Sequence, residues 1–273
     1  MKFFKYEGCG NHFILLDRVI AHVAALEITP ALVSSLCEPH FGIGGDGVLV
    51  IDQVHPPESV VHSIYRMTVY NADGSSAEMC GNGLRCVGRY LQRYNYFGTG
   101  SESTIIQTGA GPLPLAIRSD GMIGVQMGWP TILESVQLSA AAPLARYSLG
   151  NPHLVTYNSE HTLDRLLLAE QWSTQIAGGI NISFAEQLSP RAVKLSVHER
   201  GCGWTMACGT GACATIYDGY LDQRFSMGET ITVSLPGGDL EIEITEGGLL
   251  MWGPAKEIYS GQLSEELLES LSR

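Results

Sequence analysis

Short runs of apolar residues, each broken by Gly, Pro, Asn or Asp, make up most of the chain. Examples are residues 48–51, 105–106, 123–125 and 231–233. Runs of this length, bounded by turn-forming residues, are typical of β-strands. Longer, largely apolar segments at 84–91 and 212–217 predict two buried helices. The pattern therefore predicts an α+β fold that is rich in strands and has few helices.

The two helical segments belong to a sequence repeat. Residues 66–71 read Arg-Met-Thr-Val-Tyr-Asn and residues 194–199 read Lys-Leu-Ser-Val-His-Glu, so basic, apolar, hydroxyl and valine positions match in order. Nine positions then separate Asn71 from Cys80 and Glu199 from Cys208, and each cysteine opens a Cys-Gly-x-Gly segment. Self-similarity of this kind indicates an internal duplication. We infer two similar halves related by an approximate two-fold axis.

We expect two pseudo-symmetric domains, each a strongly curved, mostly antiparallel sheet wrapped around its central helix. Loop-forming residues cluster between 111 and 121 and indicate a boundary there. Residues 1–116 would form the N-terminal half, joined by the C-terminal segment 258–273, and residues 117–257 would form the other half. A length of 273 residues suits two domains of common size.

Composition narrows the possible functions. The formal net charge is −12, and the 16 Lys and Arg residues are scattered, so no basic face is available to bind nucleic acid. Charges interrupt the apolar residues of the first segment, 1–7, and no apolar run approaches the about 20 residues of a membrane span. We expect a cytoplasmic protein without nucleic acid or membrane partners; a homodimer is compatible with the sequence.

The chain contains seven cysteines, which are interpreted as reduced thiols because no export signal accompanies them. Neither Cys-x-x-Cys nor His-x-x-x-His occurs, so no metal site is expected. Cys86 and Cys213, inside the helical segments, are interpreted as small packed residues. Cys80 and Cys208 could pack in the same way, but their matched positions favour a chemical role.

A cysteine at a helix start is suited to proton transfer, because the helix N-terminus stabilises a thiolate. The following glycines let the backbone approach a ligand, and the unpaired N–H groups can bind a carboxylate. Two such helix starts around one small molecule suit inversion at carbon: one thiolate removes the α-proton while the other thiol protonates the opposite face. The two sulfurs would share one proton, and this scheme needs no cofactor.

Several further motifs accompany the cysteine segments. They are Gly8-Cys9-Gly10-Asn11-His12-Phe13, His40-Phe41-Gly42-Ile43-Gly44-Gly45-Asp46-Gly47, Asn71-Ala72-Asp73-Gly74, Glu78-Met79-Cys80-Gly81-Asn82-Gly83, Gly150-Asn151-Pro152-His153, Glu199-Arg200-Gly201, Ala207-Cys208-Gly209-Thr210-Gly211 and Leu235-Pro236-Gly237-Gly238-Asp239. With these motifs the chain resembles the diaminopimelate epimerase family, cofactor-independent enzymes of lysine and peptidoglycan precursor synthesis. The resemblance runs through the whole chain.

The resemblance implies a site as well as a fold. It implies that Cys80 and Cys208 are the two bases and that His153 and Glu199 assist the sulfurs. The amino-acid substrate would be held by Asn11, Asn71, Asn82, Asn151, Asn181, Glu199 and Arg200, with Gly81, Gly209 and Thr210 receiving its reacting carboxylate through backbone groups. Arg200 would suit the distal carboxylate.

Three positions depart from the family pattern. His12 replaces an Asp, Cys9 replaces an apolar residue, and Gly47 stands where some members have a glutamine near the substrate. The pocket could therefore accept other amino acids, such as glutamate.

Other interpretations remain open from the sequence. Asn71 and Asn82 could be turn formers, His153 a core histidine, and Glu199-Arg200 a solvated pair. The string Gly42-x-Gly44-x-x-Gly47 occurs in dinucleotide sites, but a strand rather than a helix is expected after it. The alternatives for function are a proline or hydroxyproline racemase, and a non-catalytic binding protein in which Cys80 and Cys208 form a thiol switch.

Overall fold

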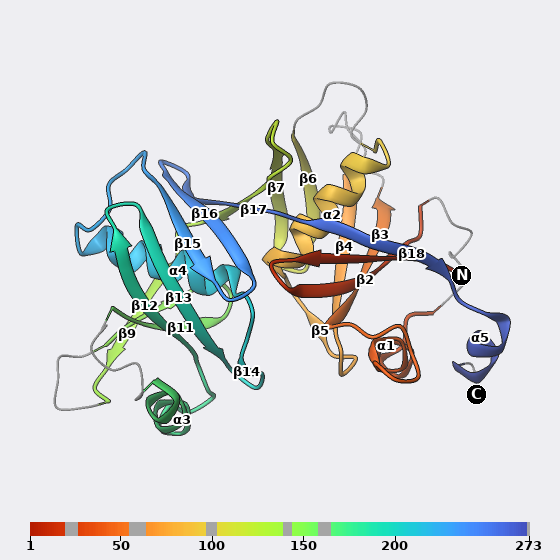
Figure 1. Cartoon of the computed structure of the whole chain (residues 1–273), viewed down its shortest axis with the longest axis horizontal. Coiled ribbons are helices and arrows are strands. Elements are labelled where there is room, and N and C mark those ends of the chain that lie inside the picture. Colours follow the sequence, from red (N-terminus) through yellow and green to blue (C-terminus); the bar gives the residue numbers. More distant parts are fainter. Residues whose placement is uncertain (20–26, 55–63, 97–102, 139–143, 158–164, 272–273) are drawn as a thin grey trace. The chain divides into compact units, whose positions relative to one another are not determined.

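The computed structural model describes residues 1–19, 27–54, 64–96, 103–138, 144–157 and 165–271. It divides into two compact units, one formed by Met1–Val125 with Pro254–Arg273 and the other by Gln126–Gly253 (Figure 1). Both are rich in strands and contain few helices, which confirms the predicted α+β fold.

The first unit consists of the elements from β1 to the start of β8, together with two elements of the C-terminal segment. Its elements are β1 (Lys2–Gly8), β2 (Asn11–Asp17), α1 (Pro30–Cys37), β3 (Gly47–Val54), β4 (Ile64–Asn71), β5 (Ser76–Ala77), α2 (Gly81–Arg93), β6 (Ser103–Thr108), β7 (Gly111–Ile117), the start of β8 (Ile123–Gly128), β18 (Lys256–Gln262) and α5 (Glu265–Leu271). The strands pair in the order β18-β1-β2-β3-β4-β6-β7-β8, with β2–β3 and β4–β6 parallel and the other pairs antiparallel.

The second unit repeats this arrangement. Its elements are β9 (Thr131–Val136), β10 (Leu144–Ser148), β11 (Pro152–Thr156), α3 (Arg165–Gln175), β12 (Asn181–Ser189), β13 (Ala192–Glu199), β14 (Gly203–Trp204), α4 (Gly209–Leu221), β15 (Thr230–Leu235), β16 (Gly238–Thr245) and β17 (Gly248–Gly253). The order is β9-β10-β11-β12-β13-β15-β16-β17, with β11–β12 and β13–β15 parallel. Strand for strand the two units share one topology, with α1 and α2 matched by α3 and α4, whereas α5 has no counterpart among the described residues of the second unit.

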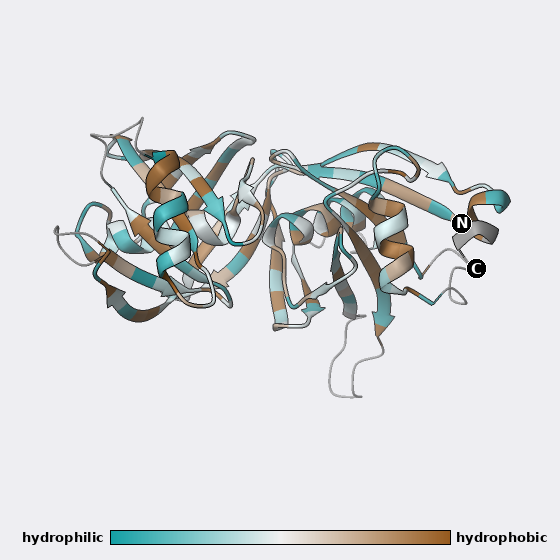
Figure 2. Cartoon of the chain, turned by 90° about the horizontal axis from the view of Figure 1, so that it is seen from below, coloured by the Kyte–Doolittle hydropathy of each residue, from teal (hydrophilic) through white to brown (hydrophobic). Residues whose placement is uncertain are grey.

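Each unit is built around one central helix. In the first unit α2 contacts β1, β2, β3, β4, β7 and β18, and in the second α4 contacts β10, β11, β12, β16 and β17. A helix that touches strands from most of a sheet requires that sheet to curve around it. Apolar residues, brown in Figure 2, lie along the strands and helices of both units. The helices α2 and α4 are accordingly almost entirely buried over their first two turns.

The unit boundaries lie elsewhere than the loop formers indicated. The first falls at Val125/Gln126 rather than after residue 116, because β7 pairs with β8 through Leu115 and Val125. The second falls at Gly253/Pro254 rather than after residue 257, because β18 begins at Lys256 and pairs with β1. Strand pairing thus extends past the Gly and Pro residues on which the expectation rested.

Candidate active site

Cys80 and Cys208 occupy equivalent places in the two units. Cys80 is the N-cap residue of α2, with φ −142° and ψ 113°, and Cys208 is the N-cap residue of α4, with φ −129° and ψ 103°. Both conformations are extended, as N-cap residues require. Each sulfur therefore lies beside backbone N–H groups that have no partner within the helix.

We call the residues around each cysteine a half-site. In the Cys80 half-site the cysteine is partly exposed, and its sulfur accepts a backbone hydrogen bond. The Gly83 N–H lies 3.4 Å from Cys80 Sγ, and the residue is partly exposed. A Cβ at position 83 would lie 2.9 Å from Leu49 Cδ2, so the second glycine of the motif is needed for close packing against β3. The Cys-Gly-x-Gly sequence thus combines a sulfur at the helix start with a helix lying close to its sheet.

The Cys208 half-site is buried, and its sulfur has different neighbours. Cys208 is 4% exposed, and its Sγ lies 3.5 Å from Thr210 Oγ1. Burial raises the pKa of the Cys208 thiol, the negative charge of Glu199 raises it further, and the contact with Thr210 lowers it. The expected lowering of the pKa by the helix start is outweighed here, so Cys208 is a protonated thiol at neutral pH.

His153 connects to Cys208 through Thr210. Its Nε2 lies 2.9 Å from Thr210 Oγ1 and 3.2 Å from Asn151 Oδ1. Burial lowers the pKa of His153 to about 3, so the ring is neutral at neutral pH. Because Asn151 Oδ1 can only accept, the Nε2 atom carries the proton. No hydrogen-bond partner for His153 Nδ1 occurs among the described residues.

Thr210 can therefore donate its own proton to sulfur. Its hydroxyl oxygen accepts from Asn151 Nδ2 at 3.3 Å and faces the Nε2 proton of His153. Because Asn151 and His153 both donate to this oxygen, the hydroxyl's own proton is directed to Cys208 Sγ. From the sequence, only the backbone of Thr210 was expected to bind the substrate. A role for its hydroxyl group was not predicted, because a threonine in a sequence does not show which groups its side chain contacts.

The other predicted site residues of the second unit are held by hydrogen bonds among neighbouring segments. Asn181 Nδ2 donates to the Pro152 carbonyl at 2.9 Å, and Asn181 Oδ1 accepts from the Arg200 N–H at 3.0 Å. Glu199 Oε1 accepts from Thr205 Oγ1 at 2.6 Å. The Arg200 side chain is exposed and donates from Nη1 to the Gly178 carbonyl. Residues 151, 153, 181 and 199, predicted as site residues, are thus brought together around Cys208 and Thr210.

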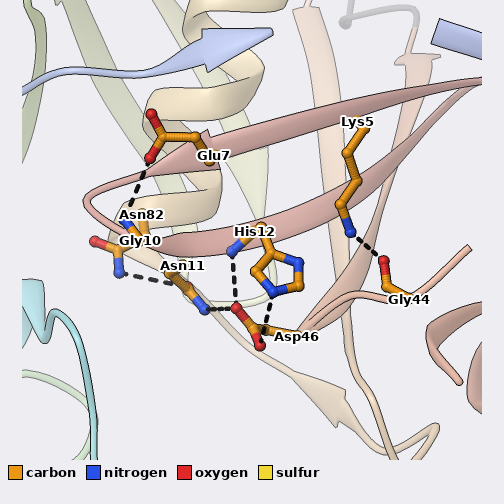
Figure 3. Close-up of polar contacts among 8 residues, drawn as sticks. All are labelled: Lys5, Glu7, Gly10, Asn11, His12, Gly44, Asp46 and Asn82. Carbon is orange, nitrogen blue, oxygen red and sulfur yellow. Dashed lines mark hydrogen bonds and ion pairs between the residues drawn. The ribbon is translucent and has the colours of Figure 1, made fainter. Parts of the chain in front are cut away.

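In the first unit, Asn11 and Asn82 form the matching pair. Asn82 Nδ2 lies 3.4 Å from Asn11 Oδ1, and Asn11 Nδ2 lies 2.7 Å from Asp46 Oδ2 (Figure 3). Asp46 Oδ2 also accepts from the His12 N–H at 2.8 Å. The motif that contains Asp46 gives this residue no role by itself, because its partners come together only when β2 and β3 pair in parallel.

Asn71 and Gly47 lie in one row across the sheet. Gly47 pairs with Phe13 of β2 and with Asn71 of β4. Asn71 Nδ2 donates to Ser75 Oγ at 3.0 Å within the turn after β4, so its turn-forming role is real. A Cβ at position 47 would lie 2.4 Å from the Tyr70 carbonyl oxygen, which leaves no room there for a glutamine.

The structure was also searched for clusters of metal-binding side chains and for membrane-spanning helices. Among the residues that the structure describes, no three His, Cys, Asp or Glu side chains gather as metal ligands would. Within the same ranges, no helix is both long enough and apolar enough to cross a membrane.

Comparison with solved structures defines the class of fold. A probable proline racemase from Agrobacterium radiobacter K84 superposes with a TM-score of 0.69 at 12% identity, over 97% of this chain and 93% of that chain. A hydroxyproline epimerase from Agrobacterium vitis superposes with a TM-score of 0.65 at 13% identity, over 96% of this chain and 90% of that chain. The fold is therefore the one found in racemases and epimerases of this kind.

Sequence comparison is more specific. The family model for diaminopimelate epimerase matches residues 3–133 and 147–258. A diaminopimelate epimerase from Cyanothece sp. (strain PCC 7425 / ATCC 29141) is 35% identical over 287 aligned positions, which cover 96% of this chain and 99% of that protein. The chain belongs to the diaminopimelate epimerase family.

Proposed function

We propose that the chain interconverts LL- and meso-diaminopimelate by proton transfer between Cys80 and Cys208. The observation that carries the proposal is that these cysteines are the N-cap residues of equivalent helices in two units of one topology. Membership of the diaminopimelate epimerase family supplies the substrate. An amino-acid α-proton is weakly acidic, so two positioned groups, one on each face of the α-carbon, are what the inversion needs.

In this mechanism the pair of sulfurs holds one proton. The buried Cys208 favours its neutral thiol, since burial and the charge of Glu199 both raise its pKa, so we assign it the role of proton donor and Cys80 the role of base. The Cys80 thiolate takes the α-proton, the electron pair of the broken C–H bond moves into the α-carboxylate, and the Cys208 thiol protonates the opposite face. Afterwards Cys80 is the thiol and Cys208 the thiolate, ready for the reverse reaction.

Thr210, His153 and Glu199 assist the second sulfur. The Thr210 hydroxyl donates to the thiolate formed at Cys208, and neutral His153 keeps that hydroxyl directed at the sulfur. The Glu199 carboxylate disfavours the thiolate by its charge and thereby makes that thiolate a stronger base for the reverse reaction. Hydrogen bonds to a charged group are worth about 1.5–3 kcal/mol, enough to shift a thiol by one or two pKa units.

The helix starts receive the reacting carboxylate. The N–H groups of Gly81 at α2, and of Gly209 and Thr210 at α4, are the first of their helices and lack intrahelical partners. Asn11, Asn71, Asn151 and Asn181 supply further polar contacts to the substrate. The exposed guanidinium of Arg200 binds the distal carboxylate.

Incubation of LL-diaminopimelate with the enzyme in heavy water tests this function. We expect meso product carrying deuterium at the inverted carbon, because the proton delivered by the second thiol comes from solvent. A non-catalytic thiol switch would leave the α-hydrogen unexchanged. Proline and hydroxyproline in parallel reactions test the alternative racemase activity.

Substrate strictness is a separate part of the proposal. With His12 and Gly47 in place of family residues, the pocket accepts glutamate weakly, since glutamate keeps the reacting carboxylate and places a second one nearby. Undetectable racemisation of L-glutamate at high enzyme concentration would refute this extension and leave the main proposal intact.

A further inference from the structure

A directed series of hydrogen bonds runs along one side of the first half-site. Asn82 donates to Asn11 Oδ1, and Asn11 donates to Asp46 Oδ2 (Figure 3). The three residues come from the start of α2, the start of β2 and the loop before β3. They are distant in sequence, so the series exists only in the folded unit.

Asp46 determines the direction of this series. An amide can rotate by half a turn and exchange its oxygen for its nitrogen, but an ionised carboxylate only accepts. Asn11 must therefore turn its NH₂ group toward Asp46 and its oxygen toward Asn82. Water in place of Asp46 could donate as well as accept, and would leave both orientations open.

The carboxylate is itself held in place on two sides. Asp46 and His12 exchange hydrogen bonds, from the Asp46 N–H to the His12 carbonyl at 2.8 Å and from the His12 N–H to Asp46 Oδ2. The buried Lys5 donates to the Gly44 carbonyl, two residues before Asp46, and so tethers the loop. His12 Nε2 lies 3.7 Å from the second carboxylate oxygen.

The second unit has the same pair with the opposite direction. Asn151, which is equivalent to Asn11, donates to Thr210, which is equivalent to Asn82. There the neutral His153 faces Asn151 Oδ1 and turns the amide the other way. The equivalent asparagines are thus set in opposite senses, by a carboxylate in one unit and by a histidine in the other.

We propose that Asp46 is a positioning residue for the substrate, which fixes the Asn11 amide so that its second N–H, rather than its oxygen, is presented to a substrate carboxylate. The substrate part of this inference rests on the proposed function. The orientation of the amide is a property of the free protein and can be measured without substrate.

Kinetics provides one test, with diaminopimelate as the substrate. Asp46→Ala should raise KM about fivefold, as expected for one net hydrogen bond, and change kcat by less than about twofold. Asp46→Asn should restore KM to within about twofold of wild type, since its amide oxygen can accept both bonds made by Oδ2. In Asn11→Ala, adding Asp46→Ala should raise KM no further, because Asp46 acts through Asn11. Asp52→Ala is the matched control: it removes a carboxylate of β3, six residues after Asp46, that pairs with Arg18.

A purely structural role for Asp46 would give different results. The Asp46 and Asn11 effects on KM would then multiply, and Asp46→Asn would be as impaired as Asp46→Ala. Either result overturns the inference.

NMR of the side-chain amides, with asparagine labelled by ¹⁵N, gives the test that needs no activity. The Asn11 signals are identified by their loss in Asn11→Ala. Asp46→Ala should shift or broaden the signals of both Asn11 and Asn82, and Asp52→Ala should change neither. Unchanged signals in Asp46→Ala would overturn the inference even if the enzyme is active. The expected shifts in a protein without epimerase activity would support the orienting role of Asp46 and refute the proposed function alone.

Discussion

At the scale of single residues, the two cysteines differ more than their identical motif indicates. Cys80 is partly exposed and accepts a backbone hydrogen bond, whereas Cys208 is buried beside a carboxylate. The carboxylate comes from Glu199, and the residue at the equivalent place in the first unit is Asn71, a neutral amide. Residues outside the motif therefore give the two sulfurs different surroundings.

In the proposed mechanism, replacing either cysteine removes one of the two groups that carry the proton. Cys80→Ala and Cys208→Ala should each lower kcat for epimerisation by about a thousandfold or more, since general acid–base groups contribute about 10²–10⁴-fold. Thermal unfolding measures whether the fold is retained. Cys202→Ser is the control, because Cys202 is exposed and lies outside both helix starts. Near-normal turnover in either alanine variant would rule out the two-base mechanism.

The buried His153 makes stability dependent on pH. Its pKa is about 3 in the folded protein and near 6.5 when unfolded, so below pH 6.5 the unfolded chain binds the proton that the folded protein excludes. The free energy of unfolding should therefore fall as pH decreases from 6.5 toward 3, by up to about 1.4 kcal/mol per pH unit from this residue.

Urea unfolding of His153→Gln between pH 4 and 6 measures this contribution. The free energy of unfolding of the variant should fall less steeply with decreasing pH than that of wild type, and the difference in slope corresponds to at most one bound proton. His40→Gln, at an exposed loop position, should match wild type. Equal slopes in wild type and His153→Gln would show that His153 is not buried in its neutral form.

Residue types and spacing could predict the cysteines but not all of their neighbours. The repeat located Cys80 and Cys208, because strand, spacing and glycines match in both halves. Asp46 and the Thr210 hydroxyl could not be assigned from the sequence, because their roles depend on partners 35 and 57 positions away. Pairing of β2 with β3 brings Asp46 to Asn11, and packing of α4 against β11 brings Thr210 to His153.

At the scale of elements, the repeat extends well beyond the matching sequence. The pairing order of the strands is the same in both units, and α1 and α2 correspond to α3 and α4, although the sequence similarity was visible only around β4 with α2 and β13 with α4. Apolar runs and helix-start motifs were sufficient to predict strands and central helices. The unit boundaries were not predictable in this way, because a Pro-containing strand, β7, still pairs on both sides.

Substitution of Gly47 tests whether the close approach of β3 to β4 requires a glycine at this position. Gly47→Ala should destabilise the protein by about 1–3 kcal/mol, because its Cβ would lie 2.4 Å from the Tyr70 carbonyl oxygen and the backbone would have to move. Chemical denaturation measures the loss. Gly247→Ala, whose Cβ would meet nothing closer than 3.9 Å, should stay within about 0.5 kcal/mol of wild type. If the two variants are equally stable, position 47 has room for a side chain.

At the scale of the whole molecule, the proposed reaction divides its machinery between the two units. Cys80 and the Asn11–Asn82 pair belong to the first, and Cys208 with Thr210 and His153 to the second. A mechanism in which both sulfurs reach one α-carbon requires the two thiols to come close enough to react with each other when substrate is absent.

Oxidation tests that requirement. In a Cys202→Ser background, which removes the exposed thiol, a mild oxidant should link Cys80 to Cys208 and abolish activity, and a thiol reductant should restore it. Peptide mass spectrometry identifies the cross-link, and diaminopimelate should slow its formation by separating the sulfurs. Full activity in protein shown to carry the Cys80–Cys208 cross-link would exclude the two-base assignment.

The pairing of β1 with β18 sets an order of events during synthesis. β1 leaves the ribosome before the second unit is made, whereas β18 emerges only after the entire second unit. The nascent chain can therefore complete the sheet of the second unit while β1, with Phe3 and Phe4, still presents an unpaired edge. Unpaired apolar edges promote aggregation, so a chain cut short after residue 253 would retain a whole second unit and a first unit that adheres to other chains.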